Sequence, residues 1–121
     1  MAKKILYIDD EAIIGNIYKK LLNNSGFEAE WVSSVAAAEK LAATFQADLL
    51  LVDNGLEEGK DGIEAIPDLK KAFPKAKIVI FSNHTESEKK GQALKLGADY
   101  YWLKIETKGN KLVQAITKVL K

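Results

Sequence analysis

The segment Asp48–Asp53, DLLLVD, decides the fold of this 121-residue chain. Four apolar residues follow one another between two carboxylates, a pattern typical of a parallel strand that is buried on both faces. The segments Lys4–Asp9, KILYID, and Lys77–Ser82, KIVIFS, have the same pattern. We therefore predict that these three segments form the central strands of a sheet.

Two further segments are predicted to be strands at the edges of that sheet. Glu28–Val32, EAEWV, alternates polar and apolar residues, and Tyr100–Leu103, YYWL, is rich in aromatic residues. Between the strands, apolar residues recur at the spacing of a helix that buries one face. The helical stripes are Ile13, Ile14, Ile17, Tyr18, Leu21 and Leu22; Val35, Ala38, Leu41, Ala42 and Phe45; and Leu112, Val113, Ile116, Val119 and Leu120.

Capping residues indicate where the helices start and stop. The first helix is expected to end at Gly26, and Thr85–Glu88 has the spacing of a capping box that opens a helix ending at about Leu96. Asp61–Glu64 has a similar spacing, but Pro67 would remove a backbone donor from the helix that it opens. That helix is therefore expected either to kink or to begin at Pro67.

Strands and helices alternate along the chain, and a last helix follows the fifth strand. Because crossovers between parallel strands are right-handed, this order predicts a doubly wound α/β sheet with helices on both faces. Placing the continuous apolar runs centrally predicts the strand order 2-1-3-4-5 and a flavodoxin-like fold with five helices. The length is that of one domain, so we predict a single domain over residues 1–121.

The composition excludes several kinds of protein. There is no cysteine, and therefore neither a disulfide framework nor a thiolate zinc site. All 18 basic residues are lysine and the net charge is only +1, which disfavours direct binding to nucleic acid. The N-terminal apolar run is too short for a secretory signal or a membrane span, so we expect a cytoplasmic protein that does not enter the membrane.

Polar side chains lie at the predicted carboxyl ends of four strands, where ligands bind in open α/β sheets. They are Asp9–Glu11, Asp53, Ser82 and Lys104. A polar residue at the end of one buried strand would be ordinary, but carboxylates gathered on adjacent strands repel one another unless a cation enters. Mg²⁺ (or Mn²⁺) is the natural candidate. With a lysine and a hydroxyl beside it, this set of groups indicates phosphoryl transfer with a carboxylate as the nucleophile.

Four motifs, in this order, resemble the receiver domains of bacterial two-component response regulators over nearly the whole chain. They are ILYIDDE at 5–11, DLLLVD at 48–53, IVIFS at 78–82 and GADYYWLK at 97–104. The resemblance implies that Asp53 is the phosphoacceptor. It also implies that Asp10 binds Mg²⁺ directly, that Asp9 binds it mainly through water, and that Gly55 offers its backbone carbonyl.

The resemblance also implies roles in switching. Lys104 would contact the phosphoryl group and Ser82 would shift to hydrogen-bond it. Tyr101, three positions before the lysine, would report the switch, although it could equally be an ordinary aromatic residue of an edge strand. His84 lies where such domains tune loss of the phosphoryl group, unless it is a solvated loop residue. Trp31 and Trp102 are expected to pack against the protein rather than to contact a ligand.

Three departures from the family pattern affect these expectations. Ile105 stands where a proline usually follows the lysine, and because a cis non-proline bond costs roughly 3 to 4 kcal/mol we predict a trans peptide. The loop 54–62 lacks the usual proline and is one residue longer. Asn83 replaces a small residue and is expected to narrow access to Asp53.

The leading hypothesis is a phosphorylation-controlled switch. Asp53 would take a phosphoryl group from a sensor histidine kinase or a histidine phosphotransfer protein. The surface of the fourth helix, fifth strand and fifth helix would then change toward a downstream protein target, an output domain or a second copy of the chain. The domain would catalyse its own phosphorylation and dephosphorylation without being a conventional enzyme.

Three alternatives stay open, and each has a distinguishing feature. A non-phosphorylated interaction module with the same fold would be expected to lack a key side chain. A small aspartyl-phosphate phosphohydrolase would place its second acid two positions after the nucleophile and would carry a cap domain. A flavin-binding relative would need backbone donors where Asp9–Glu11 would repel a phosphate.

Overall fold

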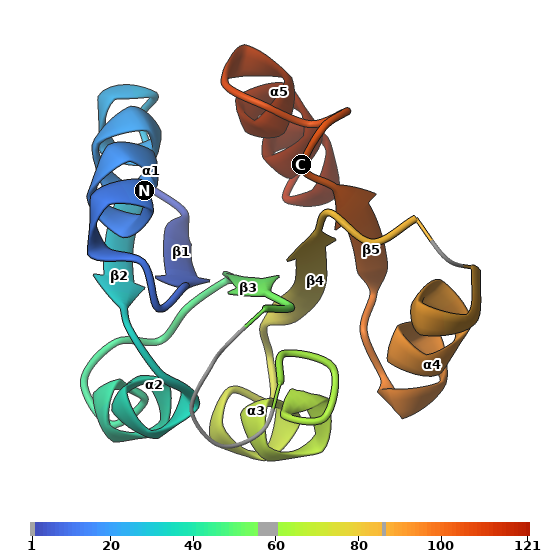
Figure 1. Ribbon diagram of the computed structural model, residues 1–121. Coiled ribbons are helices and arrows are strands. Elements are labelled where there is room, and N and C mark those ends of the chain that lie inside the picture. Colours follow the sequence, from blue (N-terminus) through green and yellow to red (C-terminus); the bar gives the residue numbers. More distant parts are fainter. Residues whose placement is uncertain (1, 56–60, 86) are drawn as a thin grey trace.

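The apolar runs of the sequence form a parallel sheet of five strands in the order β2-β1-β3-β4-β5, as predicted (Figure 1). The computed structural model describes residues 2–55, 61–85 and 87–121. The strands are β1 (Lys4–Ile8), β2 (Glu28–Val32), β3 (Leu49–Asp53), β4 (Lys77–Ser82) and β5 (Tyr100–Leu103). The helices are α1 (Ala12–Asn24), α2 (Val35–Leu41), α3 (Ile66–Ala72), α4 (Ser87–Leu96) and α5 (Asn110–Val119).

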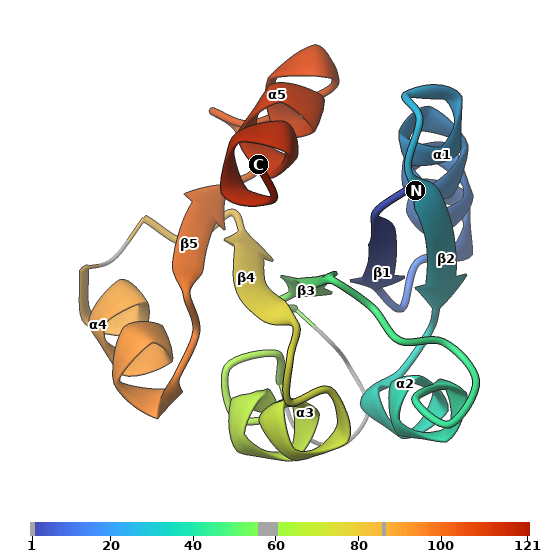
Figure 2. The same ribbon diagram turned by 180° about the vertical axis from the view of Figure 1, so that it is seen from behind.

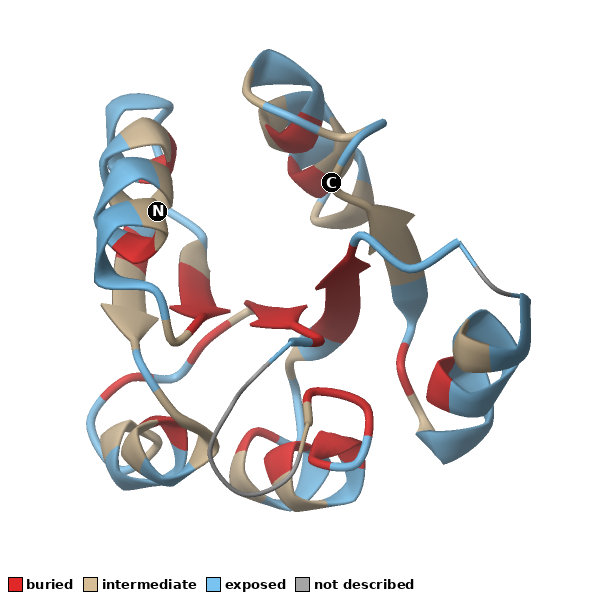
Figure 3. Cartoon of the chain, viewed as in Figure 1, coloured by how far each residue is buried: buried red, intermediate tan, exposed pale blue. Residues whose placement is uncertain are grey.

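The helices form two layers, one on each face of the sheet. Figures 1 and 2 show α1 and α5 on one face, with α2, α3 and α4 on the other. Side chains alternate along each strand, so Leu6 and Ile8 of β1 join the core under α2–α4. Ile5 and Tyr7 join the core under α1 and α5. Figure 3 shows that burial is greatest along the inner strands, where the sequence is continuously apolar.

One helix, α2, is shorter than its sequence signal. The stripe from Val35 predicts a helix reaching Phe45, whereas α2 ends at Leu41. The chain turns there because the Thr44 amide donates to the Leu41 carbonyl at 3.0 Å, which tightens the last turn. Phe45 is still buried, so the stripe correctly identified a core residue outside the helix.

Helix α3 is not interrupted by its proline but begins beside it, close to the second of the two predicted outcomes. This helix begins at Ile66, which places Pro67 in its first turn, where a missing N–H costs no hydrogen bond. Asp61 accepts a hydrogen bond from the Glu64 amide at 2.7 Å, before the helix begins. The predicted capping box at 85–88 includes residue 86, which lies outside the described residues.

Two glycines follow helices at the ends that the sequence predicts, Gly26 after α1 and Gly97 directly after Leu96. Gly26 follows α1 with φ +96°, and Gly97 follows α4 with φ +115°. Both values lie in the left-handed region that favours glycine. Among the helices of the described residues, none combines the length and the apolar character needed to cross a bilayer.

Candidate functional site

Three carboxylates meet at the carboxyl ends of β1 and β3. Asp9 and Asp10 follow β1, Asp53 is the last residue of β3, and one oxygen of each lies within 4.8 Å of the others. Asp9 and Asp53 are buried, while Asp10 is half-buried at the opening. Oxygen ligands in this arrangement fit a hard divalent cation, which would offset their mutual repulsion.

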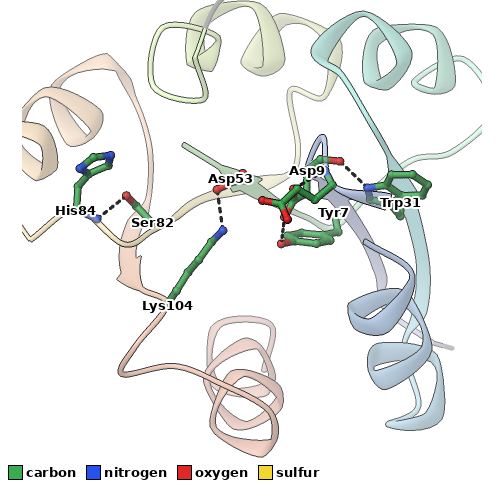
Figure 4. A network of polar contacts seen from close by, with 8 residues as sticks. Tyr7, Asp9, Trp31, Asp53, Ser82, His84 and Lys104 are labelled. Atoms are coloured by element: carbon green, nitrogen blue, oxygen red, sulfur yellow. Dashed lines mark hydrogen bonds and ion pairs between the residues drawn. The ribbon is translucent and has the colours of Figure 1, made fainter. Parts of the chain in front are cut away.

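Lys104 enters the same site from the residue after β5. Its Nζ lies 2.8 Å from Oδ1 of Asp53 (Figure 4). The backbone holds the lysine in place, since its amide donates to the Ser82 carbonyl at 2.8 Å. Its ammonium group also lies 5.6 Å from the centre of the Phe81 ring. A positive charge therefore lies beside an oxygen of Asp53, the carboxylate that is predicted to be the nucleophile.

Ser82 and Tyr101 are joined through the backbone of His84. The buried Ser82 Oγ accepts a hydrogen bond from the His84 amide at 3.0 Å. The hydroxyl of Tyr101 donates to the His84 carbonyl at 2.8 Å. In Figure 4 the imidazole of His84 points away from Asp53. A change at Ser82 thus has a short path to Tyr101 through the main chain.

Asp9 is held by two donors. Its Oδ2 accepts from the Tyr7 hydroxyl at 2.5 Å, and its Oδ1 accepts from the Glu11 amide at 2.9 Å. Burial raises the pKa of Asp9, because the charged carboxylate loses hydration, while these two hydrogen bonds act in the opposite direction. Burial also raises the pKa of Tyr7, and the bond to Asp9 adds to the effect. Tyr7 is therefore a neutral donor at physiological pH.

An aromatic cluster supports this side of the site. The rings of Tyr7 and Tyr18 meet edge to face with centres 5.3 Å apart, and the Tyr18 and Phe81 rings do so at 5.8 Å. Burial raises the pKa of Tyr18. Trp31 and Trp102 pack against the same core, as predicted, but the indole of Trp31 also donates to the Asp9 carbonyl at 2.7 Å.

The backbone after Asp53 is closely packed. Gly55 is adjacent to the carboxylate, since a Cβ built on it would lie 3.7 Å from Asp53 Oδ2. A Cβ built on Gly62 would lie only 2.6 Å from the Asp53 carbonyl oxygen. Asn54 is buried, and within the described part of the chain its Oδ1 has no hydrogen-bond partner. The predicted extension of the loop falls partly on residues 56–60, which lie outside the described residues.

Four of the predicted residues converge: Asp9, Asp10, Asp53 and Lys104. Asn83 is exposed, and its effect on access to Asp53 stays a prediction. The structure contains no cis peptide bond among the described residues, so the bond between residues 104 and 105 is trans, as predicted.

Sequence reasoning missed four residues of the site: Tyr7, Trp31, Asn54 and Gly62. Of these, only Tyr7 could have been predicted from the sequence. It lies two positions before Asp9, and side chains two positions apart in a strand point to the same face.

Comparisons with known proteins show the family to which the chain belongs. The family model of the response regulator receiver domain matches residues 5–117. The chemotaxis protein CheY of Thermotoga maritima is 29% identical, with all of both chains covered. A receiver domain protein (CheY-like) of Methanospirillum hungatei has a TM-score of 0.88 at 25% identity, covering 99% of this chain and 94% of that one.

A further solved relative carries ligands. It is a response regulator from Burkholderia pseudomallei with a phosphorylated aspartic acid, a calcium ion and citrate. It has a TM-score of 0.78 at 26% identity, covering 97% of this chain and 74% of that chain. Some relatives are longer: the chain spans 42% of a Bacillus subtilis transcriptional regulatory protein to which it is 28% identical over 80% of its own length.

Proposed function

Because this chain belongs to the response regulator receiver domain family, we propose that it is a signalling switch in which Asp53 accepts a phosphoryl group. The observation that carries the proposal is the 2.8 Å pairing of Lys104 with Asp53, beside two further carboxylates. A structural ion pair would not require Asp9 and Asp10 at the same place. A site that receives both a divalent cation and a phosphoryl group requires all four charges.

The proposed reaction is an in-line displacement at phosphorus. An oxygen of Asp53 forms the new O–P bond while the N–P bond of a donor phosphohistidine breaks, and the bonding electrons leave with the imidazole nitrogen. Lys104 already lies at Oδ1, so its ammonium can pair with a phosphoryl oxygen as charge develops there. Mg²⁺ bound by Asp9, Asp10 and Asp53, with the Gly55 carbonyl, would neutralise charge on the transferred group.

Ser82 would link the reaction to the switch. Its hydroxyl accepts from the His84 amide at 3.0 Å, which leaves its own proton available for a phosphoryl oxygen. A shift of Ser82 toward the phosphoryl group would move His84, whose carbonyl holds Tyr101 at 2.8 Å. We propose that the surface of α4, β5 and α5 changes in this way. Phosphorylation then acts as a ligand that favours one of two conformations.

A protein is the proposed donor in the cell. Ile13 and Ile17 lie one turn apart on α1 with 76% and 56% of their surface exposed, and Ile105, directly after Lys104, is 70% exposed. Large exposed apolar side chains beside the proposed phosphoryl-transfer site support contact with a partner protein. We propose a histidine kinase or a phosphotransfer protein as the donor and a protein target or output domain downstream. On this proposal the chain modifies only itself and is not a conventional enzyme.

The test uses a small acyl phosphate as donor. Incubation with Mg²⁺ should add one phosphoryl group to the wild type, measured by intact mass, and hydroxylamine should remove it. Asp53→Asn should gain none. The matched control is Asp48→Asn, directly before the first residue of the same strand, which should gain one phosphoryl group like the wild type. An unmodified wild type, or a modified Asp53→Asn, would contradict the proposal.

A further inference from the structure

Trp31 joins the acidic end of β1 to helix α1. Its indole Nε1 donates to the Asp9 carbonyl at 2.7 Å, as the dashed line in Figure 4 shows. On the helix side the ring lies against Gly15, where a Cβ would overlap the same nitrogen. Glycine is unfavourable inside a helix. Here it provides the space that lets the indole reach Asp9.

The bonded carbonyl controls the direction of the next residue. The Asp9 carbonyl and the Asp10 amide belong to one planar peptide unit, so fixing the carbonyl fixes the orientation in which the Asp10 residue begins. Asp10 is the predicted direct ligand of the metal ion. The Asp9 side chain is oriented separately, by the Tyr7 hydroxyl and the Glu11 amide. Trp31 therefore acts on Asp10 through the main chain.

The surroundings make Trp31 a rigid support. It pairs directly with Tyr7 across the β1–β2 ladder, so the two side-chain donors to Asp9 are neighbours on the same face of the sheet. The Asp9 amide donates to the Val32 carbonyl at 3.1 Å. Lys19 of α1 pairs with Glu30 of β2 at 3.5 Å, which helps to hold the helix over the strand.

We propose that Trp31, placed against Gly15, is a positioning residue that sets the affinity of the acidic cluster for its divalent cation. This inference rests on the metal site of the proposed function. Beyond that function, the affinity for Mg²⁺ depends on a tryptophan that does not contact the ion. It also depends on Gly15 of α1, which leaves room for the indole.

The first experiment is Trp31→Phe, which removes the donor and keeps an aromatic ring. Isothermal titration calorimetry with Mg²⁺ should give a Kd about three- to tenfold higher than in the wild type, the equivalent of one ordinary hydrogen bond. Phosphorylation by a small acyl phosphate should be slower at limiting Mg²⁺ and should return to the wild-type rate at saturating Mg²⁺. A rate that stays low at saturation would overturn the inference, because it would indicate general damage.

The second experiment reaches the same bond from the helix. Gly15→Ala places a methyl group where the indole lies, so it should raise the Kd for Mg²⁺ as Trp31→Phe does. The double variant should bind Mg²⁺ about as well as Trp31→Phe alone, because both changes break one interaction. The matched control is Gly91→Ala in α4, where a Cβ would have nothing within 4 Å, and its Kd should equal that of the wild type.

The outcomes separate this inference from the proposed function. A wild type that binds no Mg²⁺ would remove the metal site itself, and the inference with it. A wild type that binds Mg²⁺ while Trp31→Phe or Gly15→Ala binds it equally well would overturn the inference alone. The inference would also be overturned if the increases in Kd for Mg²⁺ of the two single variants multiplied in the double variant, since they would then be two independent effects.

Discussion

Replacing Asp10 by asparagine should change the stability of the protein in opposite directions without and with metal. In EDTA, Asp10→Asn should melt at a higher temperature than the wild type, because one of three crowded negative charges is removed. With Mg²⁺ in excess, the wild type should gain stability and the variant should gain little. Differential scanning calorimetry of both proteins, with and without Mg²⁺, measures the two effects.

The geometry gives the size of each effect. Carboxylate oxygens within 4.8 Å of one another repel by about 3 kcal/mol at an effective dielectric constant of about 20. Lys104 and solvent at the half-buried Asp10 reduce this to about 1–2 kcal/mol, which is a rise of a few degrees in Tm. Mg²⁺ at about 20 times its Kd adds about 1.8 kcal/mol to the stability of the wild type.

The control for this experiment is Glu39→Gln, which removes an exposed carboxylate from α2, far from the site in sequence. It should show the wild-type response to Mg²⁺. If Asp10→Asn and the wild type gained equally from Mg²⁺, the ion would bind elsewhere. If Asp10→Asn were less stable than the wild type in EDTA, repulsion among the carboxylates would not be the main effect of the Asp10 charge on stability.

Three further variants test other parts of the site. Lys104→Ala should slow phosphorylation about tenfold or more in a mass-spectrometric time course, because the transferred group loses its positive partner. The same variant should have a lower Kd for Mg²⁺ in calorimetry, since the site loses a competing cation; a variant that is slower and also binds Mg²⁺ more weakly would contradict this. Gly62→Ala should lower the free energy of unfolding by about 1–3 kcal/mol in urea, because its Cβ would overlap the Asp53 carbonyl; no loss would mean that the loop adjusts freely. Tyr101→Phe should cost about 0.5–1 kcal/mol in the same assay, since it removes one partly exposed hydrogen bond; a loss above about 2 kcal/mol would indicate a role in the core.

The sequence was sufficient for the sheet and for the charged residues. Segments such as Asp48–Asp53 are apolar without interruption, and only a strand covered on both faces suits such a run, so the central strands and their order followed. Because parallel strands end at one edge, Asp9, Asp53 and Lys104 were expected together, and they lie together. These features depend on periodicity and on position within a strand.

The remaining features depend on tertiary contacts that have no local signature. The bond from Trp31 to Asp9 joins residues 22 apart, and it depends on a glycine in a helix that periodicity treats as neutral. The hydrogen bonds of Ser82 and Tyr101 to His84 depend on the path of the loop after β4, which the periodicity of apolar residues does not predict. The end of α2 at Leu41 was decided by a turn that the apolar stripe does not encode.

The link from Ser82 to Tyr101 passes through the amide and the carbonyl of residue 84, which every amino acid except proline supplies. The imidazole at this position can therefore be exchanged without cutting the connection. With the role that the family resemblance implies for His84, two properties of the proposed switch would be independent: the side chain of residue 84 would adjust how long the signal lasts, while the main chain would pass the signal on. On that implied role, substitutions at residue 84 other than proline should change the lifetime of the phosphoryl group and leave the connection from Ser82 to Tyr101 intact.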